Sequence, residues 1–214
     1  MNKKGILYVL GIFLLMITSC KKESDELLNS NVLIPVNTGN VWTYRSTRFS
    51  GLTAKIDTVE SRIGSKVVID GNEGFIINNT LRPFNATYFG INNSEGNLIS
   101  FGGFSDVDTL VVPSVQFRID AETGEQWDFH DVIFSYDDGT LEEKIIKVTC
   151  LSIDTLITTP MGDFTCSGFE QSPNSGEDLF NYFISENVGI VKVEHYELDR
   201  LFSNDELIDF KLIK

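Results

Sequence analysis

Short stretches rich in β-branched and aromatic residues recur along most of the chain, and they limit its fold more than any other feature. Clusters of Gly, Asn and Asp, which favour turns, separate them. Several stretches alternate apolar and polar side chains, as strands do when one face is wet. The clearest lie at 41–47, 66–70, 74–78, 110–118, 132–136, 144–149, 155–159 and 190–195. The pattern predicts a mainly β, antiparallel architecture.

Helical patterns are scarce. No window of a dozen residues beyond position 19 sustains the spacing of three and four between apolar positions that marks an amphipathic helix. Residues 25–28 and 177–183 are each predicted to form a turn or two of helix at most. Hairpin turns are predicted at 137–139, where Asp and Gly tolerate positive φ, and at 160–163.

Residues 1–19 have the pattern of a secretory signal peptide. Lys3 and Lys4 precede an apolar run over 6–17, which is shorter than the about 20 residues that span a bilayer. The run ends in ITSC, which resembles the lipobox of bacterial lipoproteins, where a diacylglycerol joins the cysteine sulfur and cleavage precedes the cysteine. The resemblance implies a lipid anchor on Cys20. An ordinary signal peptide with a chance cysteine is the alternative.

The mature chain is strongly acidic. Removing residues 1–19 takes two lysines from 17 basic residues and leaves all 31 acidic ones, so the formal charge falls from −14 to −16. Nucleic acid is therefore not expected as a partner, and anionic headgroups repel such a surface. Attachment to the membrane would depend on the lipid at Cys20.

A charged tether is predicted over 20–31. Its start, CKKESDE, resembles the acid-containing segment after the lipidated cysteine in surface-exposed lipoproteins of the Bacteroidetes type. A plain solvated linker is the alternative. The predicted location is the outer membrane, and exposure at the cell surface is left open.

A faint internal repeat divides the domain predicted over 32–214 into halves at 35–119 and 120–214. The pattern TGxxWx followed by Tyr or Phe occurs at 38–44 and at 123–129, and it holds both tryptophans of the chain. The TG pair suits a turn, and the two aromatic side chains point to one face of the following strand. Each half is predicted to open with an aromatic anchor. Coincidence is the alternative, because the intervening lengths differ.

Three motifs resemble a family of small Bacteroidetes-type outer-membrane lipoproteins of unknown function. Residues 35–44 match its PxxxGNxWxY opening, 159–164 with Cys166 match its TPxGxF turn and strand, and 187–192 match its GVGLVK closing segment. Glu and Asn at 186–187 replace the family's usual Pro and Gly, which loosens that turn. The resemblance implies a curved antiparallel sheet or half-barrel. It implies no activity, because the family has no established common function.

Cys150 and Cys166 are the two cysteines of the predicted domain. If a two-residue hairpin closes at 160–163, Cys166 lies opposite Ile157, and Cys150 is about 23 Å farther along the strand. A disulfide then requires a bend. Two buried thiols are the prediction, and a bridge is the alternative in an oxidising compartment.

Patterns for catalysis and metal binding are absent from the sequence. His130 and His195 are the only histidines, and neither has a cysteine or second histidine at metal-ligand spacing. Each is expected to be half exposed on a sheet face. No GxSxG turn or catalytic cysteine context occurs. The sequence predicts no enzyme, no cofactor and no metal site.

Two pairs of aspartates in predicted loops have side chains that could ligate calcium. Asp106 with Asp108, and Asp137 with Asp138, would ligate calcium if the loops converged, but the DxDxDG pattern is missing. Ordinary loops are the prediction.

Three tripeptides of Asp, Thr and an aliphatic residue resemble the O-glycosylation acceptor of Bacteroidetes-type secreted proteins. They begin at Asp57, Asp108 and Asp154. Ordinary strand edges explain them equally well.

Together these patterns predict a non-catalytic outer-membrane lipoprotein that presents a β-sheet domain for binding or envelope structure. One alternative is a half-barrel carrier that holds a lipid or other apolar ligand on its concave face. The second is a weak hydrolase, which a cleft gathering either histidine with Ser and Asp would support. The membrane is a predicted partner through Cys20. A protein, a glycan and an apolar ligand all stay open as partners.

Overall fold

The computed structural model describes residues 31–69, 71–79, 87–104, 109–134, 140–173 and 178–213. These residues form twelve strands and no helix. The strands are β1 Val41–Ser50, β2 Thr53–Ile69, β3 Asn72–Asn79, β4 Thr87–Ser94, β5 Asn97–Phe104, β6 Thr109–Phe117, β7 Gln126–Phe134, β8 Leu141–Thr159, β9 Gly162–Pro173, β10 Asp178–Ser185, β11 Gly189–Glu197 and β12 Arg200–Lys211. Within this part of the chain no helix has the length and apolar character needed to cross a membrane.

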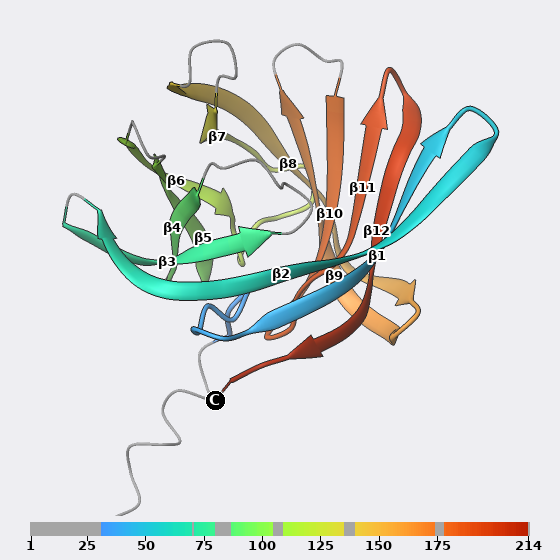
Figure 1. Ribbon diagram of the computed structural model, residues 1–214, viewed down its shortest axis with the longest axis horizontal. Coiled ribbons are helices and arrows are strands. Elements are labelled where there is room, and N and C mark those ends of the chain that lie inside the picture. Colours follow the sequence, from blue (N-terminus) through green and yellow to red (C-terminus); the bar gives the residue numbers. More distant parts are fainter. Residues whose placement is uncertain are drawn as a thin grey trace, which may run out of the picture. The chain divides into compact units, whose positions relative to one another are not determined.

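All twelve strands belong to one antiparallel sheet (Figure 1). The spatial order is β6-β5-β4-β3-β2-β1-β12-β11-β10-β9-β8-β7, so strands next to each other in sequence pair within β1–β6 and within β7–β12. The first strand pairs with the last, in a register that joins Val41 to Lys211. The predicted mainly β, antiparallel curved sheet is confirmed. The sheet is open, and its edge strands are β6 and β7.

Most predicted strand segments lie within observed strands, with two differences. Residues 144–149 and 155–159 belong to one strand, β8, which is bent where its register with β9 shifts between Cys150 and Thr155. The turn of helix predicted at 177–183 is wrong, because 178–185 form β10, paired on both sides. Its aromatic residues suit a pleated sheet better than a helix. The other predicted helical turn, at 25–28, lies outside the described residues.

The two TG turns have the same backbone arrangement. Gly39 and Gly124 both have positive φ, 90° and 87°, which glycine adopts without a Cβ clash. The Gly39 amide donates to Ile63 O at 2.9 Å, and the Gly124 amide donates to Cys150 O at 2.7 Å. Each turn therefore ties the start of its strand to the neighbouring strand in the same way.

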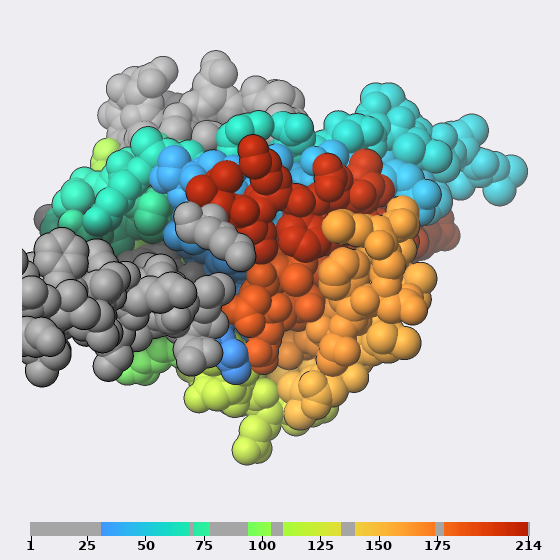
Figure 2. Space-filling view, turned by 90° about the horizontal axis from the view of Figure 1, so that it is seen from below, coloured from blue at the N-terminus to red at the C-terminus, as the bar shows by residue number. Residues whose placement is uncertain are grey.

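The hydrophobic core lies on the inner face of the sheet. Aromatic rings form its centre: the Phe169 centroid is 5.2 Å from that of Phe117 and 6.1 Å from that of Trp127. Both phenylalanines are completely buried. Figure 2 shows strands β9 to β12, coloured orange to red, side by side on one outer surface. The buried rings of Phe117, Phe129 and Phe169 belong to the core on the inner face.

The segment before β1 closes one end of the curved sheet. Leu33, Ile34 and Val36 are buried in the core. The Leu33 amide donates to Gly96 O in the β4–β5 turn at 3.3 Å, and Val32 O accepts from the Asn187 amide in the β10–β11 turn at 2.8 Å. The segment thus connects turns from the two halves. The strand ends that bear the β1–β2 and β11–β12 turns form the opposite end, here called the rim.

Side chains bridge the two edge strands. Trp127 Nε1 of β7 donates to Val115 O of β6 at 3.2 Å, and the His130 amide donates to Ser114 Oγ at 3.0 Å. Arg118 lies 4.8 Å from the Trp127 ring centroid. We call this junction of β6 and β7 the seam. Side-chain contacts join the two edge strands there without a regular ladder of backbone hydrogen bonds, so the curved sheet is not fully closed.

The domain cysteines are free and buried, as predicted. The predicted register is wrong by two residues: Cys166 lies opposite Thr155, not Ile157. The hairpin loop is Pro160–Met161, because Thr159 pairs with Gly162, whereas the prediction placed the loop one residue later.

Burial makes both thiols poor nucleophiles. It raises the pKa of Cys166 to about 11, and it also raises the pKa of Cys150. Since the thiolate is the reactive form, we expect the folded protein to resist iodoacetamide at pH 8 and to react faster as the pH approaches 11. The measurement is mass spectrometry of alkylated cysteines, with urea-unfolded protein as the reactive control. Rapid labelling of the folded protein at pH 8 would contradict buried thiols.

Candidate functional site

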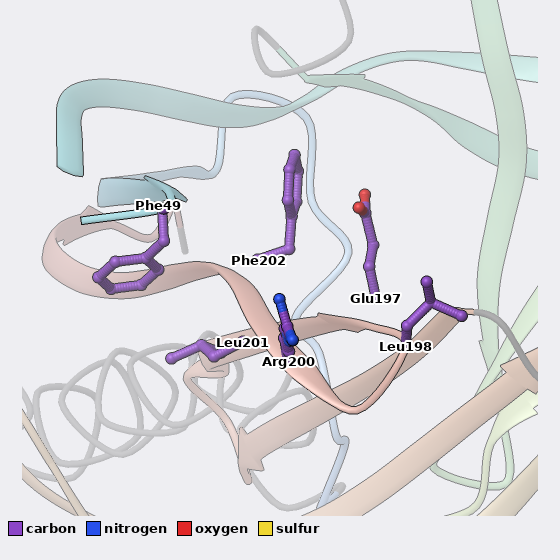
Figure 3. Close-up of a pocket in the computed structure, with 7 residues that line it drawn as sticks. Phe49, Glu197, Leu198, Arg200, Leu201 and Phe202 are labelled. Atoms are coloured by element: carbon purple, nitrogen blue, oxygen red, sulfur yellow. The ribbon is translucent and has the colours of Figure 1, made fainter. Parts of the chain in front are cut away.

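A groove of about 600 Å³ opens at the rim (Figure 3). Two neighbouring hairpins supply its walls. Apolar side chains predominate, and one carboxylate and one guanidinium lie among them. The lining residues are Phe49 and Gly51 from the β1–β2 hairpin, and Glu197, Leu198, Arg200, Leu201 and Phe202 from the β11–β12 hairpin.

The β11–β12 turn holds an unusual backbone at the edge of this groove. Leu198 and Asp199 both have positive φ, 48° and 62°, which matches a two-residue type I′ turn between the paired Glu197 and Arg200. A bulky leucine rarely adopts this conformation. Its side chain is 74% exposed. The turn therefore keeps a strained, exposed leucine beside the groove, a feature that often accompanies function.

Three side chains with metal-binding or acid–base chemistry gather beside the groove. Asp178 begins β10, and His195 and Glu197 lie two positions apart at the end of β11, so both face the same side of the sheet. Asp178 pairs with Glu197 across the strands. Their ligand atoms and that of His195 all lie within 4.8 Å of one another. His195 Nε2 is 3.1 Å from Asp178 Oδ1. We call these three residues the rim triad.

Aromatic rings fix the orientation of His195. The Phe180 ring stacks on it with a centroid distance of 4.2 Å and an interplanar angle of 11°, while Phe202 meets it edge-on at 5.2 Å. Phe180 in turn is 6.4 Å from Tyr182, which contacts Phe117 in the core. A continuous row of rings therefore joins the core to the groove, and it holds the imidazole in place.

Polar atoms without partners lie on the same inner face. Gln171 is opposite Phe180 and is only 4% exposed, yet its Nε2 has no hydrogen-bond partner. Asp205, near His195, has a buried Oδ1 without a partner. Burial raises the pKa of Asp205, against the lowering effects of the Ser46 hydrogen bond and of Arg48 and His195. Buried polar atoms of this kind normally form a hydrogen bond, so ordered water or a ligand would satisfy them.

The structure separates the two histidines by environment. His130 lies on β7 at the seam, where Nδ1 contacts Glu143 Oε1, and its side chain is 38% exposed, as expected for a half-exposed residue. His195 is only 17% exposed. Serine and aspartate do gather around His195, because Ser203 is its cross-strand neighbour. However, the hydrogen bond of its ring goes to Asp178.

In the described part of the chain, the Ser203 side chain makes no hydrogen bond to His195, although an acyl-transfer site needs one. Ser203 pairs with His195 on one side and with Arg48 on the other. The arrangement therefore supports ligand binding better than acyl transfer.

Several predicted features lie outside the described residues. These are Cys20, the signal and most of the tether, and the four loop aspartates at 106, 108, 137 and 138. Of the threonines in the three tripeptides, Thr58 is exposed on β2, Thr109 is exposed at the start of β6, and Thr155 is half-buried on β8.

The rim triad was not predicted from the sequence, because neither histidine has a cysteine or a second histidine at metal-ligand spacing. The usable signal was the spacing of His195 and Glu197, which places both side chains on one face of a strand. Asp178 is 17 residues before His195, and only the β10–β11 pairing brings it close. That pairing could not be read from spacing alone.

No protein-family model and no curated protein matches this chain. Two solved structures are similar in fold. A candidate lipoprotein from Parabacteroides distasonis aligns with a TM-score of 0.53 and 13% identity, covering 86% of this chain and all of that one. A candidate exported protein with a YmcC-like fold from Bacteroides fragilis aligns with a TM-score of 0.51 and 13% identity, covering 85% of this chain and all of that one. At this identity the likeness establishes the fold alone.

Proposed function

We propose that the protein is a non-catalytic lipoprotein, anchored to the outer membrane through Cys20, whose β-sheet domain binds a ligand at the rim. The rim groove carries the proposal, because it joins exposed aromatic and aliphatic side chains to a carboxylate and a guanidinium. Binding sites commonly combine an apolar lining with a few placed polar groups. The lipoprotein and exported descriptions of the two proteins of similar fold support an envelope location.

The packing of the inner face disfavours the carrier alternative. A carrier needs an empty apolar lumen, but Phe117, Phe129 and Phe169 are completely buried on this face. Leu33 fills the end opposite the rim and is also completely buried. An acyl chain would have to displace these side chains. The groove at the rim is open without such a change, so it is the better place for a ligand.

The proposal is tested by photo-crosslinking in the native envelope. A photoreactive amino acid at position 198 stands at the groove, and one at position 156 provides the control on the distant β8–β9 hairpin. The two leucines have similar exposed fractions, 74% and 66%. We expect a discrete adduct from position 198 and none of the same mass from position 156.

Phe49→Ser should weaken the adduct from position 198 several-fold, because it removes an aromatic wall of the groove. Native mass spectrometry of the gently extracted protein then separates a small ligand from a protein partner. Identical adducts from positions 198 and 156, or an adduct that Phe49→Ser leaves unchanged, would remove the rim as the binding surface.

A further inference from the structure

We propose that the rim triad, Asp178, His195 and Glu197, is a binding site for one divalent transition-metal ion of the zinc class. The inference rests on the proposed function in one respect, because the ion would lie beside the ligand groove, to which Glu197 also belongs. The metal ion itself is identified by the chemistry of the three side chains.

The donor set selects the class of metal. One imidazole nitrogen and two carboxylates suit zinc and its neighbours in the first transition row, whereas calcium and magnesium take oxygen ligands. Around a tetrahedral ion with bonds of about 2.0–2.1 Å, neighbouring ligand atoms stand about 3.3 Å apart. His195 Nε2 and Asp178 Oδ1, at 3.1 Å, already have this spacing. All three ligand atoms lie within 4.8 Å of one another, so the Glu197 carboxylate would have to move closer on binding.

Electrostatics favour a cation at this position. Asp178 and Glu197 are directly opposite each other on antiparallel strands, and like charges in such pairs destabilise a sheet. Arg200 lies opposite Glu197 in the next pairing. It makes no ion pair with that glutamate in the described part of the chain. A divalent ion bound between the two carboxylates would attract both of them and offset their mutual repulsion.

The surroundings hold the histidine ready for coordination. Phe180 and Phe202 pack on His195 from a face and an edge, so little side-chain entropy is lost when its nitrogen binds. This arrangement differs from that of the other histidine–carboxylate pair, His130 with Glu143. That pair forms no three-ligand group with a further described residue.

Buried polar atoms without partners occur on both faces of strands β9, β10 and β12, and two of them lie on the face of the rim triad. The strands that flank β10 and β11 each carry a polar atom without a partner, Gln171 Nε2 on β9 and Asp205 Oδ1 on β12. Gln171 is almost fully buried beside Phe180. Buried polar atoms normally bond to protein or to ordered water. Gln171 and Asp205 lie on strands three positions apart in the sheet, so separate water molecules or ligand atoms would have to supply these partners.

The experiment titrates Co²⁺ and Zn²⁺ into the mature lipid-anchored protein, with its whole β-sheet domain, in detergent after treatment with EDTA. Visible absorption follows Co²⁺, and calorimetry gives the Zn²⁺ stoichiometry. We expect one ion per chain and no thiolate-to-cobalt band, because neither buried cysteine takes part. His195→Phe keeps an aromatic ring between Phe180 and Phe202 but removes the nitrogen. It should weaken binding at least about 10-fold.

Two more variants make the result decisive. Glu197→Gln changes an exposed side chain and should also weaken binding at least about 10-fold. His130→Phe is the matched control and should bind like the wild type. Near-ultraviolet circular dichroism verifies that each variant is folded.

The inference is overturned if the wild type binds no stoichiometric ion at about 1 mM Zn²⁺. It is also overturned if His195→Phe and Glu197→Gln bind as tightly as the wild type. Equal loss in His130→Phe would also overturn it. Adducts from position 198 without metal binding would reject the metal site alone. Metal binding without these adducts would reject the proposed partner site alone.

Discussion

Phe169→Ala should lower the free energy of unfolding by about 3–5 kcal/mol, the usual cost of removing a fully buried ring. The side chain has no exposed surface and lies between the rings of Phe117 and Trp127. Its loss leaves a cavity between these two rings, which belong to different halves of the sheet. The measurement is urea unfolding of the full-length protein followed by tryptophan fluorescence.

Leu156→Ala is the matched control for this change. It also shortens an apolar side chain of the β8–β9 hairpin, but Leu156 is 66% exposed. We expect a change within about 0.5 kcal/mol. If Phe169→Ala lost less than about 1 kcal/mol, the ring would not be central to the core.

Cys20→Ser should move the protein from the membrane fraction to the soluble fraction. The serine offers no sulfur for a diacylglycerol, and each buried CH₂ of an acyl chain contributes about 0.8 kcal/mol to membrane attachment. If residues 1–19 are removed as predicted, the remaining chain has a formal charge of −16 and little other attraction to an anionic surface. Cell fractionation measures the partition, and intact mass shows the loss of lipid.

Cys150→Ser provides the control for the anchor, because Cys150 is buried inside the domain. It should remain with the membrane even if it is less stable. Cys20→Ser protein that still sediments with membranes would show that another feature of the chain attaches it.

The fold was predictable from sequence because strand signals are local. Alternation at 41–47 and the turn residues at 160–163 identify strands and hairpins without knowledge of distant parts. The β1–β12 pairing is different, since it joins residues from opposite ends of the domain. The helical turn predicted at 177–183 was wrong for the same reason: β9 and β11, on either side of β10, decide its conformation.

The candidate site was less predictable than the fold. His195 was named from the sequence, but Asp178 and the aromatic partners Phe180 and Phe202 enter only through cross-strand pairing and packing. The two similar TG turns at Gly39 and Gly124 match the faint repeat locally. The division into repeats at 35–119 and 120–214 stays a prediction.

The pairing of the first strand with the last has a consequence for the order of folding. Val41 and Lys211 are partners although about 170 positions separate them, while most other pairings join consecutive strands. Closing so long a loop costs entropy that local hairpins do not pay. We expect the two six-stranded meanders to form early and the β1–β12 ladder to form last. Because ribosomes and export channels release the N-terminus first, the chain stays without its completed sheet until β12 emerges.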